Sequence, residues 1–128
     1  MVQNLAWVFG IVFVLVGVLG FVPAVTPDGH FLGIFEVDPV HNIIHLLSGI
    51  LALGAAWTGS YARLYFQVFG VVYGVVAVAG FVQGDTVLGL IATNMADHVL
   101  HLAIAAVALW AGFGMKEGSG SMAMGGSM

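Results

Sequence analysis

Four apolar stretches dominate the chain, and each is long enough to cross a lipid bilayer. A membrane-spanning helix needs about 20 mostly apolar residues, and we expect such helices at about residues 5–24, 39–58, 62–83 and 94–114. Only 6% of the residues are charged, whereas roughly a quarter are charged in soluble domains. The sequence therefore predicts an all-α fold, a four-helix transmembrane bundle.

Composition excludes several classes of function. Two Lys/Arg against six Asp/Glu leave no basic patch for phosphates, which excludes nucleic-acid binding. The chain has no cysteine, so thiolate metal sites and cysteine catalysis are excluded. The sequence shows no nucleophile–base pair, phosphate-binding loop or paired-carboxylate site. We therefore expect a non-enzymatic protein whose partners are the lipid bilayer and either other membrane subunits or a second copy of itself.

The orientation in the membrane follows from the two basic residues. The first apolar stretch lacks the basic start and the cleavage site of a signal peptide, so we expect it to remain as a helix. Arg63 and Lys116 then fall on the same side of the membrane, which the positive-inside rule makes cytoplasmic, together with both termini. Five aromatic residues fall at the same interface, as an aromatic belt does: Trp7, Trp57, Tyr61, Tyr65 and Trp110.

The sequence indicates a four-helix domain over residues 1–114 that is built from two similar halves, about residues 5–58 and 62–114. Phe9-Gly10 matches Phe69-Gly70 at an offset of 60, and His45-Leu46 matches His101-Leu102 at an offset of 56. Each half holds two spans, so the halves would be parallel helical-hairpin repeats. Residues 115–128 are Gly, Ser and Met apart from Lys116, Glu117 and Ala123, and we expect a flexible tail without a metal-binding role for its methionines.

Ionisable residues stand at matching positions near the starts of the second and fourth helices. In the alignment of the halves, His41 corresponds to Asp97 and His45 to His101, and the members of each pair are four residues apart. That spacing places both side chains of a pair on one face of their helix. Small residues continue each face along the helix and permit close packing, namely Gly49, Ala52 and Ala56, and Ala105, Ala108 and Gly112. All four side chains are therefore predicted to point into the bundle.

This cluster has three interpretations. Three imidazoles and a carboxylate (His41, His45, His101 and Asp97) could hold a divalent transition metal such as zinc in a tetrahedral site. The same residues could instead form a hydrogen-bonded polar cluster that fixes helix register. In the third interpretation, His45 and His101 are axial ligands of haem b, although closely packed helices leave little room for a porphyrin. A redox or transport component, using the cluster for haem, metal or proton transfer, is the alternative function.

Several weaker signals complete the sequence analysis. The loop after the first helix contains Asp28, Glu36 and Asp38, which could gather cations toward the cluster or could simply form a solvated surface. His30 in the same loop could reach the outer mouth of the cluster or could be solvated. Tyr73 lies in the middle of a span, where we expect it to find an internal hydrogen-bond acceptor.

The segments VHNIIHL and ADHVLHL, together with the runs LGIFEVDPVHN and ARLYFQVFGVVYG, resemble a prokaryotic family of four-helix membrane proteins called domain of unknown function 4383. The resemblance covers about residues 5–114. It implies the four-helix fold and a location in the plasma membrane of a prokaryote, and it implies no activity. The family's motif positions are occupied here by His41, Asn42, His45, Asp97 and His101. Asparagine is usual in the family at the position of His98.

Overall fold

The structure is a computed structural model that describes residues 1–116, and within them the chain forms four long helices. These are α1 (Val2–Leu19), α2 (Pro39–Thr58), α3 (Ala62–Gln83) and α4 (Met95–Gly114). Each is long and apolar enough to cross a membrane, so the chain is a multi-pass membrane protein and the predicted all-α fold is confirmed. Apart from residues 115 and 116, the predicted tail lies outside the described residues.

The first helix begins and ends earlier than the predicted range of 5–24. Proline restricts the preceding residue to extended backbone, and its ring collides with the carbonyl four residues earlier in a helix. Val22 accordingly has φ −95° and ψ 113°, and α1 ends at Leu19, four residues before Pro23. The chain continues through two 3₁₀ turns, η1 (Pro23–Val25) and η2 (Pro27–Gly29).

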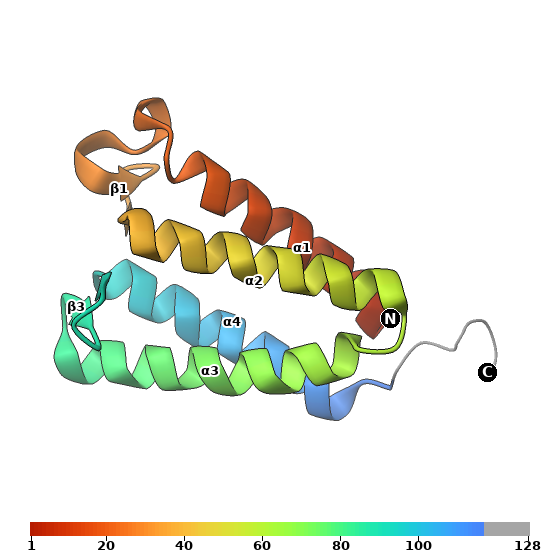
Figure 1. Ribbon diagram of the computed structural model, residues 1–128. Coiled ribbons are helices and arrows are strands. Elements are labelled where there is room, and N and C mark those ends of the chain that lie inside the picture. Colours follow the sequence, from red (N-terminus) through yellow and green to blue (C-terminus); the bar gives the residue numbers. More distant parts are fainter. Residues whose placement is uncertain (117–128) are drawn as a thin grey trace.

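The helices form two antiparallel pairs, with α1 packed along α2 and α3 packed along α4 (Figure 1). Small residues allow the close approach. A Cβ added at Gly49 of α2 would lie 2.6 Å from the backbone nitrogen of Val14, and one added at Gly112 of α4 would lie 2.6 Å from that of Gln67. The predicted small-residue faces are buried, which confirms that they face helices rather than lipid.

One end of the bundle, here called the loop end, carries two short β-hairpins that the sequence did not predict (Figure 1). Both are antiparallel: β1 (His30–Phe31) pairs with β2 (Phe35–Glu36), and β3 (Thr86–Val87) pairs with β4 (Ile91–Ala92). Each turn has two successive residues with positive φ, Leu32 (56°) and Gly33 (74°) in one, Leu88 (56°) and Gly89 (69°) in the other. Paired positive φ values are the mark of type I′ hairpin turns.

An aromatic core joins the two helix pairs. Phe9 of α1 meets Phe66 of α3 edge to face at 4.9 Å between ring centroids, and Phe13 meets Phe69 at 5.4 Å. The hydroxyl of Tyr73 lies 3.3 Å from the Ser48 hydroxyl, which confirms that this mid-span tyrosine has an internal partner.

Tyr65 differs from three of the other residues assigned to the aromatic belt. Its hydroxyl donates a hydrogen bond of 2.9 Å to the backbone carbonyl of Ser48 in α2, and its ring stacks on Phe69. Tyr65 therefore points into the bundle, whereas Trp57, Tyr61 and Trp110 are exposed on its surface.

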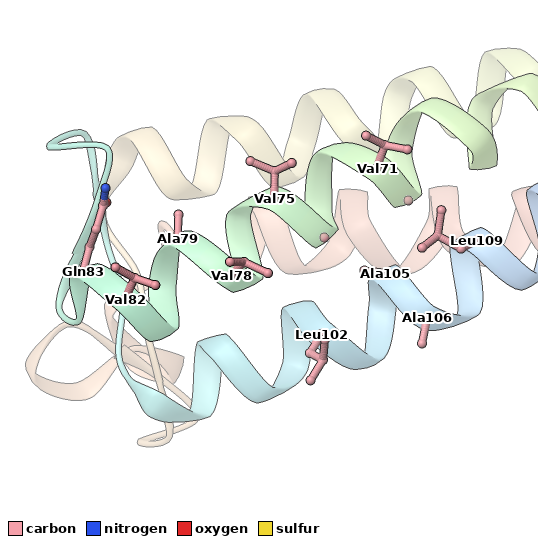
Figure 2. Close-up of a pocket in the computed structure, with 12 residues that line it drawn as sticks. Val71, Val75, Val78, Ala79, Val82, Gln83, Leu102, Ala105, Ala106 and Leu109 are labelled. Atoms are coloured by element: carbon pink, nitrogen blue, oxygen red, sulfur yellow. The ribbon is translucent and has the colours of Figure 1, made fainter.

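An apolar groove of about 730 Å³ runs between α3 and α4 (Figure 2). Val71, Val75 and Val78 line it from α3, and Leu102 and Leu109 line it from α4. None of the described residues that line it has an ionisable side chain, so the groove is an apolar surface and not a candidate metal site.

Candidate metal centre

Three histidines from α2 and α4 converge in the interior near the loop end. His41, His45 and His101, here called the three-histidine cluster, each offer a ring nitrogen within 4.8 Å of the other two. Their ring centroids are 4.4 Å (41–45), 5.5 Å (41–101) and 6.1 Å (45–101) apart. Each side chain is almost fully buried. The two helix pairs thus turn their histidine-bearing faces toward each other, as predicted.

The first turn of α2 positions His41, and a contact with β4 determines which of its ring nitrogens is left without a partner. Asp38 caps the helix, its Oδ1 accepting a 2.7 Å hydrogen bond from the His41 backbone nitrogen. The His41 Nδ1 lies 3.1 Å from the carbonyl oxygen of Ala92 in β4. A carbonyl only accepts, so Nδ1 carries the proton and donates it, which leaves a lone pair on Nε2. That Nε2 is buried and has no hydrogen-bond partner among the described residues.

This arrangement is typical of histidines that bind metals. Such a histidine usually donates its other ring N–H to a carbonyl or carboxylate, which fixes the tautomer and the ring orientation. In His41 the Ala92 carbonyl plays that part, and the lone pair is free to coordinate.

His45 and His101 also carry buried ring nitrogens that lack partners within the described part of the chain. In each ring Nδ1 is the unpartnered atom. Phe13 of α1 packs edge-on against His45 and Tyr73 of α3 against His101, both at 5.5 Å between centroids. Leaving a buried polar atom unsatisfied costs roughly 1–3 kcal/mol, and a metal ion at the centre of the cluster would remove that cost.

Asp97, the fourth ligand expected from the sequence, is instead bound to the N-cap in the first turn of α4. Its Oδ2 accepts a 3.0 Å hydrogen bond from the backbone nitrogen of Asn94, and its own backbone nitrogen donates to the Asn94 Oδ1 at 3.0 Å. This reciprocal pair is a capping box at the start of α4. Asp97 is buried but does not belong to the close group that the three histidines form.

The helix caps also tie the two helix pairs together, a role that sequence reasoning missed. Asp38 accepts a second hydrogen bond, at 2.8 Å, from the backbone nitrogen of Ala92 in β4. In the opposite direction, the side chain of Asn94, which caps α4, donates a 2.9 Å hydrogen bond to the carbonyl of Ile34 in the loop before α2. The start of each histidine-bearing helix is therefore held by the loop of the other helix pair.

Replacing Asn94 with alanine is expected to lower the free energy of unfolding by about 1–3 kcal/mol. The variant loses both the cap of α4 and the bond to Ile34, and a cap alone contributes about 1 kcal/mol. Unfolding in mixed detergent micelles with increasing dodecyl sulfate would measure the loss. Asn4→Ala, at an exposed position in α1, is the control and should change stability by less than about 0.5 kcal/mol. Equal effects of the two substitutions would contradict the role of Asn94.

The remaining two histidines lie outside the three-histidine cluster. His30 is the first residue of β1, with Nδ1 2.9 Å from the carbonyl oxygen of Asp28. His98 donates from Nε2 to the carbonyl of Gly84 at 2.7 Å and packs on Gly80 of α3. Asn42 packs in the same way on Gly20.

Comparison with known protein families confirms the resemblance that the histidine-bearing motifs indicate. Residues 3–114 match the family described as domain of unknown function DUF4383. The chain belongs to this family. No curated protein and no solved structure matches it. The function of this DUF4383 protein is therefore argued from the three-histidine cluster that it contains.

Proposed function

We propose that this DUF4383 protein is a non-enzymatic membrane protein that binds a divalent transition metal, such as zinc, in its three-histidine cluster. One ring nitrogen from each of the three buried histidines lies within 4.8 Å of the other two, and this convergence carries the proposal. Tetrahedral ligands at about 2.0–2.1 Å from zinc lie about 3.3 Å apart, so side-chain movements of about 1–1.5 Å would complete the site. The fourth position would be taken by water or another small ligand.

Binding is favoured over a purely structural cluster because of the unpartnered nitrogens. A hydrogen-bonded cluster would pair its buried donors and acceptors. Here His41 Nε2, His45 Nδ1 and His101 Nδ1 have no such partners within residues 1–116. We assign binding rather than catalysis because the neighbouring carboxylate of Asp97 is engaged in the capping box of α4.

A metal ion is favoured over haem b by the packing around the rings. The His41 ring lies 4.4 Å from His45 and 5.5 Å from His101, and the rings of Phe13 and Tyr73 close the other sides. A porphyrin plane between His45 and His101 would have to displace these side chains.

The proposed orientation directs the cluster toward the outer face of a prokaryotic plasma membrane. Arg63 stands at the start of α3 and Lys116 follows the end of α4. Figure 1 shows these two helix ends beside the N-terminus, at the end of the bundle opposite the loop end. The positive-inside rule places that end in the cytoplasm. The cluster would then exchange metal with the outer side.

We also infer that the two helix pairs arose by duplication. Asp38 and Asn94 both cap a histidine-bearing helix, and the Leu32-Gly33 and Leu88-Gly89 turns share the same backbone conformation. In each case the corresponding residues are 56 positions apart, which is the offset found in the sequence.

A second candidate function, proton transfer within a transport or redox component, is favoured by one observation. The Tyr73 ring contacts His101, its hydroxyl contacts Ser48, and Tyr65 donates to the Ser48 carbonyl. Hydroxyl groups thus extend from the cluster toward the middle of the bundle. This candidate ranks second because Tyr73 meets the cluster through a ring contact rather than through a hydrogen bond.

Cobalt(II) binding tests the proposed function. Full-length protein in a nonionic detergent is expected to bind one Co²⁺ per chain, with the strong visible absorption of four-coordinate cobalt, and Zn²⁺ should displace it. His30→Gln, which alters the β1 histidine outside the cluster, should leave this absorption unchanged. The triple variant His41→Gln, His45→Gln and His101→Gln should lose it. Folded protein that binds no Co²⁺ would reject the metal proposal and favour proton transfer.

A further inference from the structure

Both β-hairpins at the loop end carry exposed apolar side chains at their tips. The tip of the β1–β2 hairpin is Leu32-Gly33-Ile34 and that of the β3–β4 hairpin is Leu88-Gly89-Leu90; these segments are here called the hairpin tips. Their four large side chains are 54–67% exposed. Turns that face water usually carry polar residues or glycine, so four exposed aliphatic side chains at matching places indicate that an apolar medium covers them.

Leucine also occupies a strained position in each tip. Leu32 and Leu88 both have φ 56°, in the left-handed region where asparagine or glycine is the usual turn residue. Asparagine there would relieve the strain and would suit a turn in water. Leucine at this position in both halves therefore points to a use for its apolar side chain.

Hydrogen bonds fix the level of the tips relative to the helices. The side chain of Asn94, the cap of α4, donates to the Ile34 carbonyl in the first tip. Asp38, the cap of α2, accepts a bond from the backbone nitrogen of Ala92, two residues after the second tip. Figure 2 shows the β3–β4 hairpin, which follows Gln83, running across the end of the bundle rather than along its axis. Each tip therefore lies level with the start of a helix from the other pair.

That level coincides with the boundary of the bilayer. The helices α2 and α4 each have 20 residues, which gives a length of about 30 Å, the thickness of the hydrocarbon core. The starts of both helices, and with them the hairpin tips, consequently lie at the level of the lipid headgroups. Apolar side chains at the headgroup level gain stability by entering the boundary between headgroups and acyl chains.

The loop end lacks the side chains that usually anchor a helix bundle at this level. Tryptophan and tyrosine are enriched at both interfaces of membrane proteins. The chain has three of each. Tyr73 lies in mid-span, and the others all lie toward the opposite end of the bundle, namely Trp7, Trp57, Trp110, Tyr61 and Tyr65. At the loop end, the aliphatic hairpin tips are placed to anchor the bundle instead.

We propose that both hairpin tips insert into the lipid leaflet at the loop end and anchor that end of the bundle. Lipid, rather than a protein partner, covers the tips because the hydrogen bonds to the helix caps hold them at the headgroup level. The insertion goes beyond the proposed function and does not depend on it, since no metal ligand takes part.

A fluorophore on a single cysteine tests the insertion, because the chain has no cysteine of its own. Leu90→Cys is labelled with bimane in the full-length protein, in phosphatidylcholine vesicles that contain lipids with a nitroxide high on the acyl chain. Val99→Cys, at an exposed position in α4, is the lipid-facing reference. Asp85→Cys, at an exposed charged position at the base of the same hairpin, is the control. The label at 90 should be quenched within about twofold of that at 99, and at least about threefold more than that at 85.

A polar substitution in the same tip tests the role of leucine. Leu88→Asn, added to the Leu90→Cys variant, suits the left-handed turn and should leave the hairpin folded. It should lower the quenching of the label at least about twofold. The proposal fails if this substitution changes nothing, or if the label at 90 is quenched no more than the label at 85. Emission shifted to the blue without quenching by the lipid would show that protein covers the tip, and would also overturn the proposal. Ile34→Cys tests the first tip in the same way.

Discussion

Alanine in place of Gly49 is expected to lower the free energy of unfolding by about 2–3 kcal/mol, because overfilling a tight helix contact costs about that much. Gly49 lies where α2 packs on α1. The added Cβ would lie 2.6 Å from the Val14 nitrogen and 2.9 Å from the Gly10 oxygen. Both are backbone atoms, so no side-chain rotation relieves the overlap and α1 has to move away. Tryptophan fluorescence during unfolding in mixed micelles would measure the loss.

The same helix provides a matched control. A Cβ at Gly54 meets nothing within 4 Å, so Gly54→Ala makes the same chemical change without a collision. Alanine also favours helix over glycine by up to about 1 kcal/mol, and the control should therefore be neutral or stabilising. Equal losses in the two variants would show that α1 and α2 do not pack through this face. Because Gly49 lies one turn from His45, the destabilised variant should also bind cobalt more weakly.

The helices could be predicted from the sequence because their lengths and apolarity are set by the bilayer. The hydropathy of each segment is a local property, and breakers such as Gly59, whose φ is 72°, mark the ends. The end of α1 differs from the prediction because apolar residues continue to Val22, whereas Pro23 stops the helix at Leu19.

The β-hairpins could not be predicted, because their turns use leucine where sequence reasoning expects glycine or asparagine. Leu32 and Leu88 both have φ 56°, a conformation that side chains with a Cβ seldom adopt. Non-local bonding holds the first turn in place, since the Leu32 nitrogen donates to the Val25 carbonyl at 2.7 Å. The residues of the turn alone do not indicate that this hydrogen bond forms, so the turn could not be predicted from them.

The three-histidine cluster could be predicted because two signals agree, the spacing of four residues on each helix and the correspondence between the halves. The expectation for Asp97 rested on its correspondence to His41. Both occupy the third position of a helix, and both backbone nitrogens bond to the capping side chain. The side chains diverge because a short carboxylate reaches its own cap at Asn94, whereas the longer imidazole of His41 reaches across to Ala92.

Glutamine in place of His101 is expected to weaken cobalt binding at least about 1,000-fold, which corresponds to about 4 kcal/mol. His101 is the cluster's single contribution from α4, so the variant retains only the two ligands of α2. Changes to groups that merely orient ligands cost about 10–100-fold, and the loss of a ligand should exceed that range. Competition with a chelator of known affinity would measure the change.

Asp97→Asn separates the three-histidine site from the four-ligand site expected from the sequence. Asparagine can still accept the hydrogen bond from the Asn94 nitrogen, so the cap of α4 is retained. If three histidines form the site, cobalt affinity should fall less than about fivefold, because only a neighbouring charge has been removed. A loss as large as that of His101→Gln would mean that Asp97 leaves its capping box when metal binds. The metal would then compete directly with the start of α4 for this carboxylate.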